Sequence, residues 1–153
     1  MYEPSKIRKS ATESVGAQLL AELEHAYTDV EIYMAELAEL LDLQQPDRAR
    51  LTTVRLKLAQ LRLVQGAAVS RIYRHLIANS DEAQGNELKE MHSSHLGLLN
   101  MTSAHTTKWT LDAIEADWPG YQKATRGIVH FGLEKMNAER KTLNSLLERD
   151  ACI

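Results

Sequence analysis

The sequence predicts an all-α protein, and within that class an antiparallel up-down-up-down four-helix bundle. Turn-forming and helix-breaking residues gather in three short stretches, at residues 44–47, 79–86 and 117–120. They divide the chain into four long segments, rich in Leu and Ala, in which apolar residues recur every three or four positions, the period of an α-helix. Because the connections between these segments are short, neighbouring helices are expected to run antiparallel.

The first helix is predicted over residues 11–43, after a flexible N-terminal arm formed by residues 1–10. Ser10 and Glu13 have the spacing of a capping box, which favours a helix start at this point. Steps of three and four residues, typical of the seam of a helix bundle, connect Leu20, Leu23, Tyr27, Val30, Met34, Leu37 and Leu41.

The second helix is predicted over residues 48–78, with Asp47 as its N-cap. Its seam consists of Leu51, Val54, Leu58, Leu61, Gln65, Ala68 and Ile72. Residues 11–43 hold eight acidic residues and no Lys or Arg, whereas residues 48–74 hold seven basic residues and no acid. We therefore expect the first two helices to pair, since an antiparallel hairpin places the two charged strips side by side. The alternative, a nucleic-acid-binding face, lacks the interleaved aromatic residues of such surfaces.

The third and fourth helices are predicted over residues 82–116 and 120–149. The third seam contains Leu88, Met91, His95, Leu98, Thr102, His105 and Trp109. The fourth is less regular and contains Val129, Gly132 or Leu133, Met136, Leu143 and Leu146. Asp117 suits an N-cap, and Pro119 suits a first turn, where its missing N–H costs little. Residues 11–150 are accordingly predicted to form one domain.

A second stripe on the second helix also has the helical period, and it contains Leu56, Ala59, Leu63, Gly66, Ser70, Tyr73 and Ile77. A helix that is apolar on two sides is buried on two sides. Since only one side of a helix faces the core of a four-helix bundle, this stripe predicts a homodimer interface, with a widened core face as the alternative.

Composition excludes several classes of protein. Lys and Arg number 18 against 21 for Asp and Glu, a net charge of −3 that argues against general nucleic-acid binding. The single cysteine, Cys152, cannot form an internal disulfide. No apolar run approaches the roughly 18 residues of a membrane span, and the first ten residues lack the apolar core of a signal peptide. These features predict a cytoplasmic protein that associates with neither membranes nor nucleic acid.

Polar residues interrupt the apolar seams, and burying them is costly unless they have partners. Superposing the two predicted hairpins brings Tyr27, Gln65, His95 and Met136 near one level of the bundle, and Glu139 lies near the fourth seam. These five residues form the candidate layer. Tyrosine, glutamine and histidine side chains can satisfy one another by hydrogen bonds, which predicts a polar core layer or a ligand site.

Three segments resemble parts of the hemerythrin-like (HHE cation-binding) domains. LVQGAAVSRIYRHLI, residues 63–77, is similar to the second helix of the family. ERKTLNSLLER, residues 139–149, is similar to its closing Glu-Arg and leucine-rich tail. KWTLDAIEADWPGY, residues 108–121, is similar to the connection between the third and fourth helices in some members. The resemblance covers most of residues 15–149 and implies a four-helix bundle with a di-iron centre of histidines and carboxylates.

The chain departs from the metal ligands that the resemblance implies. The first-helix His position falls on Tyr27, and the second-helix His and Glu positions fall on Gln65 and Val69. Only His95 and Glu139 match the remaining ligands, and one His with one Glu cannot hold two irons. The resemblance therefore implies a degenerate member without cofactor, metal ligands or catalytic residues.

The function predicted from these features is a non-enzymatic binding or regulatory module, acting in signalling and possessing a protein partner. The alternative is a metal- or O₂-responsive protein that keeps an unusual iron site on His95, Glu139 and Tyr27. A haem held by His95 and Met136 is a further alternative. Weaker candidates for metal binding or phosphotransfer are Glu22 with His25, His92 with His95, and His105.

Overall fold

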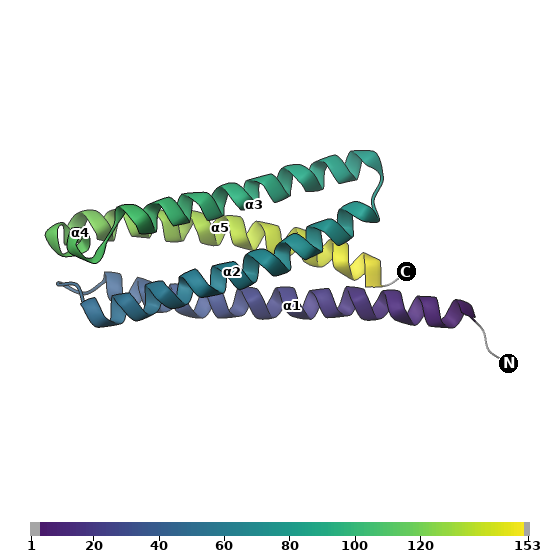
Figure 1. The fold of residues 1–153 in the computed structure, drawn as a ribbon, viewed down its shortest axis with the longest axis horizontal. Coiled ribbons are helices and arrows are strands. Elements are labelled where there is room, and N and C mark those ends of the chain that lie inside the picture. Colours follow the sequence, from purple (N-terminus) through teal and green to yellow (C-terminus); the bar gives the residue numbers. More distant parts are fainter. Residues whose placement is uncertain (1–3, 152–153) are drawn as a thin grey trace.

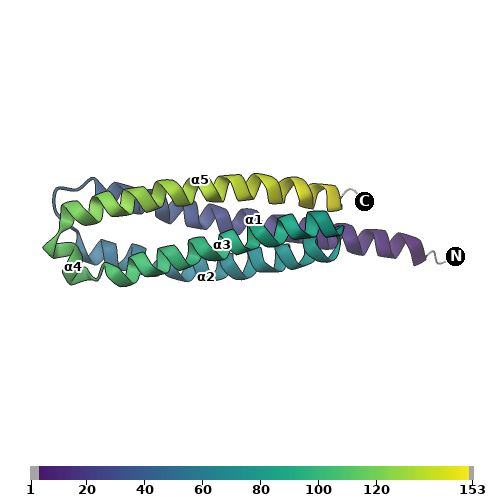
Figure 2. The same ribbon diagram turned by 90° about the horizontal axis from the view of Figure 1, so that it is seen from above.

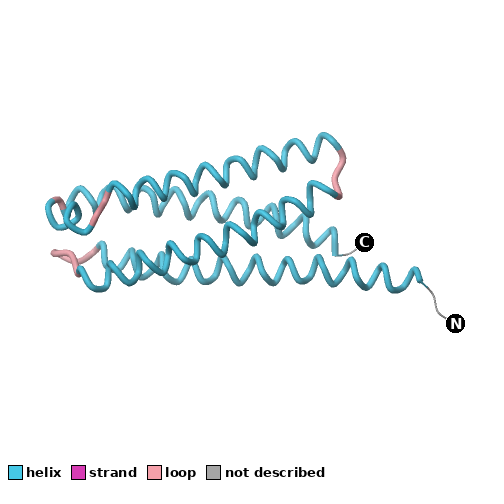
Figure 3. The backbone as a smooth tube through the Cα atoms, viewed as in Figure 1, coloured by secondary structure: helices cyan, strands magenta, loops and turns pink. Residues whose placement is uncertain are grey.

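The structure, a computed structural model, describes the backbone of residues 4–151 and the side chains of residues 15–149. Its helices are α1 (Pro4–Leu41), α2 (Arg48–Ala78), α3 (Glu82–Lys108), α4 (Leu111–Ala116) and α5 (Trp118–Ala151). Residues 4–151 contain no β-strand, and the loops lie only at helix ends (Figure 3), so the all-α prediction is confirmed.

The four long helices extend along one axis, and successive long helices alternate in direction (Figures 1 and 2). α1 packs along both α2 and α5, which confirms the expected contact between the first two helices. The backbone of α3 lies close to α2 and approaches α5 at fewer places, where individual side chains bridge the two helices. The long helices are therefore closely packed on the α1 side and separate between α3 and α5. Within residues 4–151, no helix is both long enough and apolar enough to cross a membrane.

The predicted seams of the first two helices form the core. All positions of the α1 seam except Leu20, and all positions of the α2 seam except Leu61, are buried. The α3 seam is fully buried only at Leu88, His95 and Thr102, because the backbone of α3 packs less closely on α5 than α1 packs on its neighbours.

α1 begins at Pro4, ahead of the start predicted at residue 11. Ser10 and Glu13 consequently lie within the helix instead of at its start, and the backbone of residues 4–10 is helical. The side chains of residues 4–14, and with them the predicted capping box, lie outside the described part of the chain. Residues 1–3 lie outside the described part of the chain. The other two predicted caps are confirmed: Asp47 accepts a hydrogen bond from the Arg50 amide, and Asp117 accepts one from the Gly120 amide.

The third predicted helix, residues 82–116, is in fact two helices separated by a break at Trp109. Thr110 caps α4 by accepting a hydrogen bond from the Ala113 amide at 3.2 Å. Arg55 of α2 donates to the backbone carbonyls of Thr106 and Trp109, which the break leaves without helical partners. Side chain and backbone together therefore stabilise a turn that apolar periodicity alone does not reveal.

The charged strips of α1 and α2 meet only in part. Among the side chains of residues 15–149, two ion pairs join these helices, Arg71 with Glu22 at 2.8 Å and Arg50 with Glu36 at 4.0 Å. Arg140 of α5 binds the other side of α1 instead, through Glu24 and through Glu31 at 2.7 Å. Exposed pairs of this kind contribute roughly 0–1 kcal/mol each, so they select neighbours more than they stabilise the fold.

Candidate functional site

One side chain from each of α1, α2 and α3 converges on the carboxylate of Glu139, which belongs to α5. Tyr27 of α1 donates its hydroxyl hydrogen to Oε1, and Tyr73 of α2 donates to Oε2 at 2.8 Å. His95 of α3 places Nδ1 3.1 Å from Oε1. We call Tyr27, Tyr73, His95 and Glu139 the Glu139 cluster; it is the one layer in which all four long helices share a hydrogen-bond network among the described side chains.

Burial makes these bonds necessary. Both tyrosines are 0% exposed, and the side chains of His95 and Glu139 are 4% and 12% exposed. A buried carboxylate is costly unless donors surround it, and here three donors do so. Next to it, Arg140 is held by Glu24 and Glu31 of α1 and lies 5.8 Å from the centre of the Tyr27 ring, which fixes the register of α5 against α1.

The electrostatics of the cluster favour an ionised Glu139. Burial alone would raise the pKa of Glu139, but hydrogen bonds from His95, Tyr27 and Tyr73 outweigh it and hold the pKa below its usual value. Burial and the Glu139 charge raise the pKa of Tyr27 and of Tyr73 far above that of a free tyrosine. Both phenols therefore remain protonated donors at physiological pH.

The orientation of His95 follows from the same carboxylate. Because an ionised carboxylate can only accept, Nδ1 of His95 carries a hydrogen and donates it. The other ring nitrogen, Nε2, is buried and has no hydrogen-bond partner among the described residues. In the neutral ring, Nε2 is thus an available acceptor inside the protein.

The other two predicted members of the polar layer form a separate pair. Gln65 donates its side-chain N–H to the sulfur of Met136 at 3.4 Å. Gln65, Met136 and His95 together line a small cavity of about 50 Å³. The predicted layer therefore contains two neighbouring groups, one centred on Glu139 and one on Gln65 and Met136.

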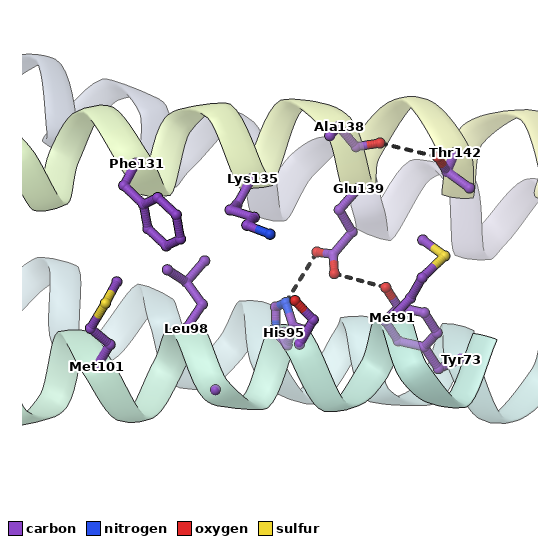
Figure 4. A pocket seen from close by; sticks show the side chains of 12 residues that line it. Tyr73, Met91, His95, Leu98, Met101, Phe131, Lys135, Ala138, Glu139 and Thr142 are labelled. Carbon is purple, nitrogen blue, oxygen red and sulfur yellow. Dashed lines mark hydrogen bonds and ion pairs between the residues drawn. The ribbon is translucent and has the colours of Figure 1, made fainter. Parts of the chain in front are cut away.

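A larger pocket lies directly above the Glu139 cluster, where α3 and α5 separate. Its volume is about 480 Å³, and Glu139, His95 and Tyr73 border it (Figure 4). The remaining lining residues are mainly apolar and come from both helices: Met91, Ser94, Gly97, Leu98, Met101, Phe131, Lys135, Ala138 and Thr142. Phe131 and Met101 are 41% and 37% exposed, unusual values for large apolar side chains. The pocket therefore has the hydrogen-bonded Glu139 cluster at its base and mainly apolar side chains along its sides.

The C-terminal half of the second stripe on α2 is not available as a dimer face. Tyr73, predicted on the dimer face, is fully buried in the Glu139 cluster, and its ring stacks on His92 at 4.8 Å. Ser70 lies 3.1 Å from the same His92, and a Cβ on Gly66 would meet Leu99 at 3.4 Å. Ile77 is partly buried against the core. This half of the stripe packs on α3 and inward, because α3 covers it along the C-terminal part of α2.

Leu56, Ala59 and Leu63 are the members of that face that remain exposed, the two leucines at 59% and 78%. Tyr73 was not placed in the polar layer from the sequence alone. The signal was present, because Tyr73, like Tyr27, carries a hydroxyl within an apolar stripe. Phe131, which belongs to none of the predicted seams, was missed as well.

The weaker candidates Glu22 and His25 are not brought together. Glu22 pairs with Arg71, while exposed His25 lies 3.9 Å from Asp29. His105 lies 3.1 Å from the Thr125 hydroxyl, in the half of the protein near α4. No three His, Cys, Asp or Glu side chains within residues 15–149 are grouped so that they could hold a metal ion.

The donor set of the Glu139 cluster does not fit a di-iron centre. Helix-bundle di-iron proteins use about six carboxylate and imidazole ligands. The cluster offers one carboxylate and one imidazole, and hydrogen bonds occupy both carboxylate oxygens. A charged core layer with hydrogen-bonding tyrosines is the chemistry these residues support.

Comparison with protein-family models, with curated proteins and with solved structures finds no significant match to this chain. The hemerythrin-like resemblance therefore stays a prediction from the sequence.

Proposed function

We propose that the chain is a non-enzymatic binding module that takes up a small, largely apolar molecule between α3 and α5. In this proposal the protein is an antiparallel up-down-up-down four-helix bundle that is open along one side. The observation that carries the proposal is the pocket of about 480 Å³ over the Glu139 cluster, a volume within the range of small-molecule sites.

The lining residues indicate the chemistry of the ligand. Met91, Leu98, Met101 and Phe131 provide apolar contact, and methionine side chains adapt to irregular shapes. Both oxygens of Glu139 already accept hydrogen bonds, so a ligand above the Glu139 cluster needs few polar groups to bind there. Binding of the ligand would connect α3 and α5 through the ligand. This change in the packing of the two helices is one that a regulatory module could transmit to a protein partner.

The Glu139 cluster acts as a positioning element in this proposal. Its tyrosines remain protonated, and Nδ1 of His95 is engaged by the carboxylate. The hemerythrin-like resemblance adds a proposed origin, since His95 and Glu139 occupy positions that would hold metal in that family.

A second candidate is a metal- or O₂-responsive protein with one iron bound at His95. The observation favouring it is that Glu139 accepts from Nδ1 and leaves Nε2 available, the arrangement that commonly orients metal-bound histidines. Elemental analysis of protein purified without chelator separates the candidates: near-stoichiometric iron that His95→Ala abolishes supports the second.

The first candidate is tested by filling the pocket. Gly97 lines it, and a Cβ added to Gly97 meets no atom within 4 Å. Gly97→Phe should therefore occupy the pocket without disturbing the fold. Gly127 of α5 has equally open surroundings and does not line the pocket, so Gly127→Phe is the matched control.

The probe is N-phenyl-1-naphthylamine, a neutral dye whose fluorescence rises in apolar sites. We expect saturable binding to the parent protein and to Gly127→Phe, and at least a tenfold loss of affinity in Gly97→Phe. Equal binding by the two variants would contradict the proposal.

A further inference from the structure

A second groove lies between α2 and α3, and its only charged lining residue is Arg62. Its volume is about 380 Å³, and it shares no lining residue with the α3–α5 pocket. The lining consists of Ala59, Arg62, Leu63, Leu99, Asn100, Thr102, Ser103, Thr106 and Thr107. The groove thus presents one guanidinium among apolar and neutral polar side chains, with no carboxylate.

Arg62 differs from the other arginines of α2 that turn towards a neighbouring helix. Arg71 pairs with Glu22, Arg48 pairs with Glu115, and Arg55 donates to backbone carbonyls. Arg62 is partly buried, yet no described residue gives it an ion pair or a hydrogen bond. A guanidinium carries five N–H donors, and withdrawing it from water without a partner is costly.

The surroundings of Arg62 are positive. Arg62 also lines two small interior cavities, one with Gln65 and one with His105. Burial and the charges of Arg55, Arg62 and Lys108 lower the pKa of His105, so this ring is neutral at physiological pH. Arg55 lines the second of these cavities together with Arg62, and neither cavity has a carboxylate among its lining residues that could compensate the guanidinium.

Further hydrogen-bond donors border the groove. Thr106 and Thr107 donate their hydroxyl hydrogens to carbonyls of α3 and have none to spare. Asn100 and Ser103 are exposed, and their side chains have no hydrogen bond with any described residue. A guanidinium, an amide and a hydroxyl can thus face the same space, while Ala59, Leu63 and Leu99 provide an apolar wall.

We propose that the α2–α3 groove binds a small organic anion, with its carboxylate or phosphate group on Arg62 and its chain along Leu63 and Leu99. A planar guanidinium binds either oxyanion with two parallel hydrogen bonds, which gives the site its selectivity for negative charge. This site is independent of the proposed α3–α5 pocket.

The test is calorimetric titration at low salt with octanoate, with octanol as the neutral analogue and inorganic phosphate as the anion without a chain. We expect octanoate to bind at one site and octanol to bind at least tenfold more weakly, since a charge-assisted bond is lost. Competition by phosphate would indicate that a free anion can occupy the Arg62 end of the groove. A lack of competition would indicate that the aliphatic chain of octanoate is required for binding.

Arg62→Leu should weaken octanoate binding at least tenfold, and Arg62→Lys should restore part of it. Arg50→Leu, a change at an exposed α2 arginine outside the groove, should leave binding unchanged. Dye binding at the α3–α5 pocket should be the same in all three variants. A failure of the α2–α3 groove proposal is therefore distinguishable from a failure of the α3–α5 pocket proposal.

Protein stability gives a second readout. Removing an uncompensated, partly buried charge should raise the Tm of the ligand-free protein, by about 3 °C for Arg62→Leu. Three results would each overturn the proposal: equal binding of octanol and octanoate, unchanged octanoate binding by Arg62→Leu, or a lower Tm for this variant.

Discussion

Replacing Tyr73 with phenylalanine isolates one bond of the Glu139 cluster. The ring is 0% exposed and stacked on His92, so phenylalanine fits the same space and only the hydroxyl is lost. That hydroxyl donates to Oε2 of Glu139 at 2.8 Å, whereas Tyr27 and His95 both bind Oε1. Tyr73→Phe therefore leaves Oε2 without its donor inside the protein.

The size of the effect follows from the charge of the acceptor. A hydrogen bond to a charged group contributes about 1.5–3 kcal/mol to stability. Because the substitution leaves a buried acceptor without a donor, the loss of stability should lie near the middle of that range or above. We expect Tyr73→Phe to lower the free energy of unfolding by about 2 kcal/mol. For a chain of this length, this corresponds to a fall in Tm of roughly 4–8 °C.

The matched control is Tyr33→Phe. Tyr33 lies partly buried on α1, and its hydroxyl has no hydrogen bond with a described residue. Urea unfolding at pH 7 should show a change near zero for Tyr33→Phe and a lower midpoint, with an unchanged slope, for Tyr73→Phe. Equal midpoints for the two variants would refute the account of the cluster.

Acid unfolding gives an independent check. Since the folded-state pKa of Glu139 lies below its value of about 4.3 in the unfolded chain, its ionisation stabilises the fold above that pH. This stabilisation is lost as the pH falls through the folded-state pKa. Tyr73→Phe removes one bond that lowers the pKa, so its acid transition should move to higher pH. No movement relative to Tyr33→Phe would contradict the assignment.

Three further predictions concern the rest of the molecule. Gly97→Ala and Gly127→Ala should each raise the free energy of unfolding by about 0.5–1 kcal/mol in urea, because a Cβ at either position has open space; a loss of stability would contradict this. If the predicted homodimer forms through the exposed part of α2, Leu56→Glu with Leu63→Glu should halve the mass measured by light scattering, and an unchanged mass would remove that interface. Iron added to the protein and then dialysed should not remain bound, and stoichiometric retention that His95→Ala abolishes would favour the metal-responsive candidate.

Much of the core could be predicted from sequence because helical periodicity reports which side of a helix is buried. Tyr27 and His95 were expected near one level, with Glu139 near the fourth seam, and all three share one hydrogen-bond network. Sequence can single out such positions because a polar residue within an apolar seam must find a partner near its own level.

The errors arose where tertiary contacts decide the local structure. The break at Trp109 depends on Arg55, which is distant in sequence and binds the freed carbonyls. Tyr73 was placed on a dimer face because spacing cannot distinguish a second copy of the chain from α3 as the element that covers a stripe. The separation of α3 from α5, and hence the pocket beside Phe131, has no periodic signal in the sequence.

Methionine-methyl NMR tests most directly whether the space between α3 and α5 is a ligand site. Met91 and Met101 line that pocket, whereas Met34 lies in the core away from it. During titration with N-phenyl-1-naphthylamine, we predict saturable shifts of the Met91 and Met101 methyl signals and a stationary Met34 signal. Equal shifts at all three methyl groups, or none at Met91 and Met101, would contradict the proposed ligand site.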